Sequence, residues 1–237
     1  MIEEFSSVEH LADTAAGAVM QRLETALSFR GRASFIATGG RAPGPVYDRL
    51  GRARLDWASV AVGLSDERCV SWTSPASNAR LVRERLLVGG AGRATFVPLW
   101  PQAADPAFAA ELGAQIACDA GLVLRGLEPF DVVLLGMGED GHVASLIPGW
   151  EGLPEAMDVA QPKLCMFVPA GHGSPPEPRI TLTLAALAQA RSILVVISGN
   201  RKRQVAEAAL AGGPVPLGVL AQVAGPRVRI LWSPGEP

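Results

Sequence analysis

The chain alternates between short apolar runs and longer amphipathic stretches along its whole length, without an internal repeat. Residues 7–29 carry Val, Leu and Ala at helical spacing, whereas residues 33–38 form a short apolar run that ends in two glycines. Strands separated by helices call for parallel pairing with right-handed crossovers. We therefore expect an α/β fold, with a doubly wound, mainly parallel sheet and helices on both faces, in a single domain spanning residues 1–237.

The expected helices and strands can be assigned from hydrophobic periodicity and from the positions of Gly and Pro, which interrupt regular structure. Strands are expected at 33–38, 60–64, 95–98, 130–135, 165–168, 193–197 and 228–232. Helices are expected at 7–29, 46–50, 78–87, 108–124, 182–190 and 201–210, with a final helix after residue 212. Gly and Pro are concentrated in residues 149–162 and 170–178, which predicts loops there.

The bulk properties exclude several classes of protein. A formal net charge of −2 argues against a general affinity for nucleic acid or an anionic membrane. No secretory signal is visible at the N-terminus, and the uninterrupted apolar runs fall well short of the ~20 residues that span a bilayer. The 3 cysteines are widely spaced and fit neither a disulfide framework nor a zinc site. These features favour a cytoplasmic protein with reduced thiols and no bound metal.

The segment after the strand at 130–135 carries the strongest functional signal. The strand breaks into Gly136-Met137-Gly138, and Asp140-Gly141-His142 follows at once. In an open α/β sheet, ligands bind at the carboxyl ends of the strands, and an acid beside a histidine suits acid–base chemistry there. An isolated Asp-Gly-His would more often be a packed histidine with the aspartate capping the next helix. The position of this one at a strand end favours a catalytic role.

Two other strand ends carry polar groups. Gly39-Gly40-Arg41 follows the first strand and opens a helix, an arrangement that lets a phosphate approach backbone amides, although a plain tight turn explains it equally well. Asp66 and Arg68 follow the second strand. Adjacent charged residues of this kind usually lie in a solvated loop. A basic residue beside an acid can also hold a polar substrate while the carboxylate takes part in proton transfer.

Two cations are expected where helices begin. Arg179 follows the Pro-rich loop, and Lys202 follows the strand at 193–197. A cation at a helix N-terminus opposes the helix dipole, and a shared anion between the two would explain it. A bidentate arginine and a point-charge lysine would together suit a phosphate monoester. The alternative is two ordinary surface cations.

Taken together, these motifs resemble those of the 6-phosphogluconolactonases, within the larger glucosamine-6-phosphate isomerase/deaminase fold family. The resemblance runs from the N-terminal helix to about residue 210. Its most specific part is Gly136 to His142, followed by Ala144-Ser145-Leu146 and Pro148-Gly149. The supporting motifs occur in the family's order: Asp66-Glu67-Arg68-Cys69-Val70, Ser77-Asn78, Arg179-Ile180-Thr181 and Gly199 to Lys202.

The resemblance implies a Rossmann-like fold of the glucosamine-6-phosphate deaminase type and hydrolysis of 6-phospho-D-glucono-1,5-lactone to 6-phospho-D-gluconate. This reaction is the second step of the oxidative pentose phosphate pathway and would need no cofactor. The enzyme would be cytoplasmic, a monomer or small homo-oligomer, with a sugar-phosphate lactone as its partner and with neither nucleic acid nor membrane.

The resemblance also implies roles for individual residues. His142 would be the general base that activates water, Asp140 would support its imidazole, and Asp66 would be a further catalytic group. Arg68, or backbone amides of the glycine turn, could stabilise the oxyanion. The remaining residues expected to bind substrate are Gly39, Gly40, Arg41, Asn78, Arg179 and Lys202.

The chain departs from the family pattern at two positions. Arg41 stands where the family usually has a small hydroxyl residue after the paired glycines, and Val143 stands where it tends to have threonine. The first departure removes a hydroxyl from the expected phosphate loop and puts a guanidinium there. Neither changes the acid–histidine pair.

Two competing functions remain. A glucosamine-6-phosphate deaminase would follow the histidine with a Phe-Asn-Glu-Pro type of segment, but this chain has Ala144 to Pro148 there and no acid until Glu151. A sugar-phosphate sensor of the same fold would normally carry a helix-turn-helix segment, for which there is no room before Ala33. A binder without catalytic activity also remains open.

Overall fold

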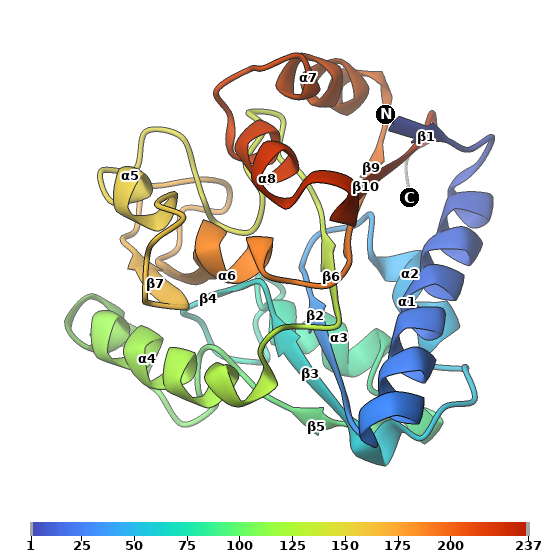
Figure 1. Cartoon of the computed structure of the whole chain (residues 1–237). Coiled ribbons are helices and arrows are strands. Elements are labelled where there is room, and N and C mark those ends of the chain that lie inside the picture. The colour runs from blue at the N-terminus through green and yellow to red at the C-terminus, as the bar shows by residue number, and fades with distance from the viewer. Residues whose placement is uncertain (1, 236–237) are drawn as a thin grey trace.

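A computed structural model describes residues 2–235, and these residues form two sheets (Figure 1). The larger sheet has seven strands, all paired in parallel. Their spatial order is β1 (Ile2–Glu4), β10 (Val228–Ser233), β9 (Ile193–Ser198), β6 (Val132–Leu135), β2 (Ala33–Ala37), β3 (Val60–Leu64), β5 (Thr95–Phe96). The smaller sheet is antiparallel, in the order β4 (Asp66–Arg68), β8 (Arg179–Leu182), β7 (Cys165–Val168).

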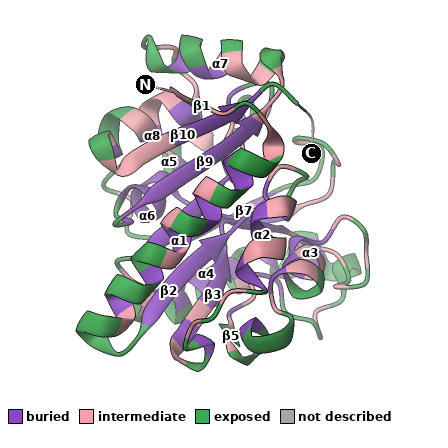
Figure 2. Ribbon diagram, turned by 90° about the vertical axis from the view of Figure 1, so that its right-hand side faces the viewer, coloured by how far each residue is buried: buried purple, intermediate pink, exposed green. Residues whose placement is uncertain are grey.

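Helices connect and cover these strands. The α-helices are α1 (Val8–Arg30), α2 (Gly44–Leu50), α3 (Asn78–Arg85), α4 (Ala109–Leu124), α5 (Leu153–Ala156), α6 (Leu184–Ala188), α7 (Asn200–Leu210) and α8 (Pro216–Ala224). Short 3-10 helices are η1 (Trp57–Ser59), η2 (Gly89–Arg93), η3 (Pro106–Phe108), η4 (Arg125–Leu127) and η5 (Gly225–Arg227). Helices α1 and α2 lie on one side of the large sheet, and α6 and α8 lie on the other (Figures 1 and 2). The expected doubly wound, mainly parallel α/β fold is confirmed.

The central strands are apolar throughout because both faces of the sheet are covered. Every residue of β2 and of β6 is buried, as expected for parallel strands between layers of helices. Helix α1 crosses in front of these strands (Figure 2). It is capped at Ser7, whose hydroxyl accepts a hydrogen bond from the amide of His10, and it ends at Gly31, which has a left-handed φ of 67°.

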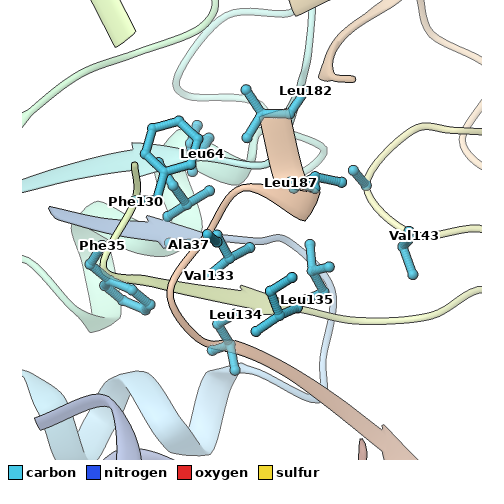
Figure 3. Close-up of a cluster of buried hydrophobic side chains, with 14 of the residues drawn as sticks. Phe35, Ala37, Leu64, Phe130, Val133, Leu134, Leu135, Val143, Leu182 and Leu187 are labelled. Carbon is cyan, nitrogen blue, oxygen red and sulfur yellow. The ribbon is translucent and has the colours of Figure 1, made fainter. Parts of the chain in front are cut away.

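The small sheet shares its core with the large one. Figure 3 shows Leu182 of β8 and Leu187 of α6 in one cluster of buried side chains. The cluster also contains Leu64 of β3, Val133 of β6 and Phe130, which lies just before β6. All five side chains are fully buried. The small sheet is therefore packed against the site-bearing strands by apolar contacts.

Several sequence predictions were wrong in this part of the chain. Arg179 begins the strand β8, not a helix, and α6 begins only at Leu184, after the N-cap Thr183. The expected strand end at Asp66 to Arg68 is the strand β4, paired with β8. Strand β7 belongs to the antiparallel sheet. The expected loop at 149–162 contains the short helix α5, and the three-residue strand β1 was not predicted.

One helical segment is more apolar than the sequence predictions recognised. Residues 106–127 are long and apolar enough to cross a membrane by length and composition, with a mean hydropathy of 1.4 in the best window. Here α4, which is part of the segment, packs against β7. A Cβ added to Gly113 would lie 2.3 Å from the ring of Phe167, which shows how closely the helix approaches the small sheet.

Candidate active site

Four neighbouring strands of the large sheet end at the same edge. Their order is β9, β6, β2, β3. Polar residues follow each strand: on loops after β6 and β2, in α7 after β9 and in β4 after β3. The carboxyl ends of parallel strands are where open α/β sheets bind ligands. A cavity of about 240 Å³ lies there. It is lined by Thr38, Gly39, Gly40, Arg41, Ala42, Pro43, Asp66, Arg68, Asn78, Gly136, Met137, Gly138, His142, Ala144, Ser174, Arg179 and Lys202.

All but one of the residues predicted for the site line this cavity. The exception is Asp140, which lies beside His142. The Nδ1 atom of His142 is 2.6 Å from Oδ1 of Asp140, and the same oxygen accepts a hydrogen bond of 3.2 Å from the His142 amide. The bond from His142 holds the pKa of Asp140 below its usual range. Because Nδ1 is occupied, Nε2 is the ring nitrogen left to act on a substrate.

The turn around His142 is built on glycine. The amide of Gly138 donates to the carbonyl of His142 at 2.9 Å, and Gly141 adopts a left-handed φ of 82°. A Cβ on Gly138 would lie 2.3 Å from Nδ1 and Cε1 of His142, so only glycine leaves room for the ring. Residues 143–149 are turns and irregular backbone, and the next helix begins only at Leu153, so the alternative in which Asp140 caps a following helix is wrong.

The first glycine loop is held from two sides. The hydroxyl of Tyr47 donates to the carbonyl of Thr38 at 2.6 Å and accepts from its amide at 2.8 Å. A Cβ on Gly39 would lie 1.8 Å from Oδ1 of Asn78. The Asn78 amide group in turn donates to the backbone carbonyl of Asp66 at 2.8 Å. Gly39 is thus required by the packing of Asn78, which ties the loop to β4.

Glu67 is a buried anchor that the sequence predictions did not separate from its charged neighbours. Its side chain is 1% exposed and accepts hydrogen bonds from the amides of Arg68 (2.7 Å), Asn78 (2.8 Å) and Ala79 (2.6 Å) and from the hydroxyl of Ser77 (3.1 Å). Burial raises the pKa of Glu67 to about 7, although the backbone donors oppose the rise. Glu67 therefore caps α3 and fixes the backbone that carries Asn78.

Asp66 and Arg179 are both buried, at 5% and 2% exposed. Asp66 accepts hydrogen bonds from the hydroxyls of Ser65 (3.0 Å) and Ser145 (2.7 Å). Burial lowers the pKa of Arg179, while the charge of Asp66 raises it. Ser145 and Thr38 were missed as site residues, although Ser145 lies in the motif that carries the resemblance.

The cavity is electropositive. Arg41, Arg68, Arg179 and Lys202 line it, and among residues 2–235 Asp66 is the lining carboxylate. Lys202 lies in the first turn of α7, which begins at Asn200, as predicted. Such a surplus of cations in a concave site attracts an anionic ligand. Within the described chain, no group of three His, Cys, Asp or Glu residues could hold a metal ion.

Comparisons with known proteins show which proteins the whole chain is similar to. The profile of the family described as "Glucosamine-6-phosphate isomerases/6-phosphogluconolactonase" matches residues 6–232. A 6-phosphogluconolactonase from Caulobacter vibrioides is 40% identical over 239 residues, covering 98% of this chain and 97% of that protein. Another from Pseudomonas putida is 36% identical, covering 98% and 93%.

Solved structures give the same result. The crystal structure of a 6-phosphogluconolactonase from Shewanella baltica has a TM-score of 0.86 at 31% identity, covering 98% of this chain and 97% of that one. A monomeric glucosamine-6-phosphate deaminase has a TM-score of 0.75 at 18% identity. The second similarity extends to the fold alone.

Proposed function

Because the chain belongs to the glucosamine-6-phosphate isomerase/6-phosphogluconolactonase family, we propose that it hydrolyses 6-phospho-D-glucono-1,5-lactone to 6-phospho-D-gluconate. The reaction is the second step of the oxidative pentose phosphate pathway. The observation that carries the proposal is the Asp140–His142 pair on a cavity lined by four cations. Near-complete coverage by relatives that are named 6-phosphogluconolactonase supports it.

His142 acts as the general base. It takes a proton from water as the oxygen attacks the C1 carbonyl, and it returns a proton to the ring oxygen as the ester bond breaks. Asp140 holds the ring through Nδ1 and stabilises the imidazolium that forms. Its lowered pKa keeps it ionised for this task. Arg68, or the amides of the glycine turn, stabilises the oxyanion.

The cationic residues hold the 6-phosphate. Arg179 and Lys202 supply positive charge, and Gly39, Gly40 and Arg41 form the loop that receives the phosphate, since all five line the cavity. Asn78 fixes this loop against β4. Anchoring the non-reacting end of the substrate places its carbonyl against His142. The two hydroxyl donors on Asp66 support a role for this carboxylate in holding the site rather than in moving a proton.

The deaminase alternative lacks the acid that it needs. Residues 144–148 provide no carboxylate after the motif histidine. Glu151, the next acid, is exposed and is not among the residues that line the cavity. Lactone hydrolysis requires only one base, whereas opening and isomerising an amino sugar asks for an additional acid–base group.

We further propose that the enzyme acts in the cytoplasm, as a monomer or small homo-oligomer. It would use no cofactor and would bind neither nucleic acid nor membrane. The net charge of −2 and the absence of a basic cluster in the sequence support this proposal.

The first test is the rate of 6-phosphogluconate formation from freshly generated lactone, coupled to 6-phosphogluconate dehydrogenase. Only the excess over spontaneous opening counts. His142→Ala should lower kcat by about 10²–10⁴-fold, the usual contribution of a general base. Lys202→Ala should mainly raise KM, through the loss of a charged contact that contributes roughly 1.5–3 kcal/mol.

Lys163→Ala is the matched control, because Lys163 is exposed, pairs with the exposed Glu155 and does not line the cavity. Its kinetics should equal those of the wild type. A near-normal kcat in His142→Ala would remove the base from the mechanism. A folded wild type that binds 6-phosphogluconate without turnover would point to a sensor instead.

A further inference from the structure

Ser145 occupies the space between the two buried charged residues of the site. Its side chain is fully buried, and its hydroxyl lies 2.7 Å from Oδ2 of Asp66 and 3.2 Å from Nη1 of Arg179. Asp66 and Arg179 form no direct ion pair in the described part of the chain. The one hydroxyl hydrogen of Ser145 goes to the carboxylate, and its lone pair accepts from the guanidinium.

The backbone around Ser145 fixes this position. Its amide donates to Oγ1 of Thr181 at 3.0 Å. The preceding residue, Ala144, has a φ of 49°, which is the one left-handed value at a non-glycine position among the described residues. Left-handed backbone at an alanine is strained and persists only where the surroundings enforce it. The turn thus presents the hydroxyl at a defined place.

The partners of Ser145 are held on their far sides as well. The second carboxylate oxygen of Asp66 accepts from Ser65, whose hydroxyl also lies 3.0 Å from Oγ1 of Thr38. Nη2 of Arg179 donates to the carbonyl of Pro175 at 2.6 Å, while its buried Nε has no hydrogen-bond partner within the described chain. Arg179 therefore has one N–H group without a partner among the residues described, and its side chain lines the cavity.

We propose that Ser145 is a positioning residue that keeps Asp66 from neutralising Arg179, so that the guanidinium remains available to a phosphate monoester dianion in the cavity. A carboxylate that reached the guanidinium directly would form a strong bidentate pair and compete with the ligand. The serine hydroxyl satisfies both groups and holds them apart. The identity of the anion as the substrate's phosphate rests on the proposed function.

Ser145→Ala should let Asp66 and Arg179 approach each other. We expect the dissociation constants of 6-phosphogluconate and of inorganic phosphate, measured by calorimetry, to rise about tenfold, with the KM for lactone rising in parallel. The value of kcat should stay within about threefold, because the Asp140–His142 pair is untouched. Ser145→Cys keeps the shape of the side chain but has only a weak donor, and it should give a smaller loss of the same kind.

The decisive comparison is a double-mutant cycle with Asp66→Asn. Without the carboxylate charge there is nothing to neutralise Arg179, so adding Ser145→Ala to Asp66→Asn should change phosphate binding less than twofold. A purely structural role of Ser145 predicts the same loss in both backgrounds. Equal losses, unchanged dissociation constants in Ser145→Ala, or a wild type that binds no phosphate would each overturn the proposal.

Ser233→Ala is the matched control. Ser233 is also fully buried, and its hydroxyl has no hydrogen-bond partner in the described chain. Its substitution should leave phosphate binding unchanged. Thermal melts of every variant establish that it is folded. A wild type that binds phosphate but hydrolyses no lactone would overturn the proposed function. The role of Ser145 would then be decided by the double-mutant cycle with Asp66→Asn, measured by phosphate binding.

Discussion

Gly138 sets the orientation of His142, because its missing side chain provides the space that the imidazole fills. In Gly138→Ala the new methyl group would overlap the ring and displace it from Asp140. A displacement of about 1 Å can cost a catalytic group ~10²-fold in rate. We therefore expect kcat to fall by that order while the protein stays folded, as measured by the coupled assay and circular dichroism.

Gly126→Ala is the comparison, since a Cβ there meets nothing within 4 Å and the residue lies outside the cavity. It should retain wild-type kcat. If Gly138→Ala were fully active, the ring would have to be free to move, and the close fit would have no catalytic consequence.

The buried carboxylate of Glu67 makes stability depend on pH. Burial raises its pKa to about 7 in the folded protein from the ordinary value of 4.5. In this interval the folded state binds more protons than the unfolded state, so the contribution of Glu67 to stability is present below pH 4.5 and is lost as pH rises towards 7. The loss should be on the order of 1–3 kcal/mol.

Glu67→Gln removes this titration. The free energy of unfolding of wild type minus that of the variant should therefore be larger at pH 5 than at pH 8, as measured by urea denaturation across the range. Taking the difference cancels the other carboxylates. A difference independent of pH would mean that the hydrogen bonds to Glu67 fully offset the effect of its burial.

At the scale of single helices, one substitution should have opposite effects in α1 and α4. Gly17 is exposed in the middle of α1, and a Cβ there meets nothing within 4 Å. Because glycine costs about 0.5–1 kcal/mol relative to alanine inside a helix, Gly17→Ala should raise the free energy of unfolding by that amount.

Gly113→Ala in α4 should instead destabilise the protein. Its Cβ would lie 2.3 Å from the Phe167 ring, and this clash outweighs the gain in helix propensity. Melting temperatures of the two variants measure both effects. A stabilised Gly113→Ala would show that α4 can move away from β7 at little cost.

At the scale of the whole molecule, the two sheets share a single core. We propose that residues 1–237 fold as one domain, of which residues 1, 236 and 237 lie outside those that the structure describes. Leu182 on the small sheet is fully buried in the cluster that also contains Val133 of the large sheet (Figure 3). Leu182→Ala should therefore destabilise both sheets together, by about 2–5 kcal/mol.

One domain predicts one transition. In Leu182→Ala, secondary structure, aromatic signals and lactonase activity should be lost together at a lower temperature than in the wild type. Two separated transitions would show instead that the small sheet unfolds independently of the large one.

Most of the large sheet was predictable because β2, β3, β6, β9 and β10 are largely apolar runs, which can be recognised from neighbouring residues in the sequence. Strand β1 was missed because two of its three residues are glutamates. In the small sheet, only β7 was predicted as a strand, and its antiparallel pairing was not. Strand β4 consists of Asp66, Glu67 and Arg68, which carry no strand pattern, and it is a strand only because it pairs with β8. Strand β8 runs into an Ala- and Leu-rich helix, so its last residue was assigned to that helix.

In the candidate site, too, local contacts were predicted and contacts between distant segments were missed. The motif predicted the contact of Asp140 with His142, because the two residues are joined through a single glycine and need no distant partner. The roles of Tyr47, Glu67 and Ser145 were missed, since each is defined by hydrogen bonds to other segments of the chain. A polar residue that will be buried looks, in sequence, like one that will be solvated.

The sequence by itself thus determined the alternation of strands and helices, the parallel sheet and the placing of glycines, acids and cations at strand ends. Only the tertiary structure decided which strand ends became neighbours and which buried charged side chains came together through Ser145. Ser145 contacts Asp66 across 79 positions and Arg179 across 34. Local spacing encodes the period of a helix or strand, but contacts over such separations depend on how the crossovers bring the elements together.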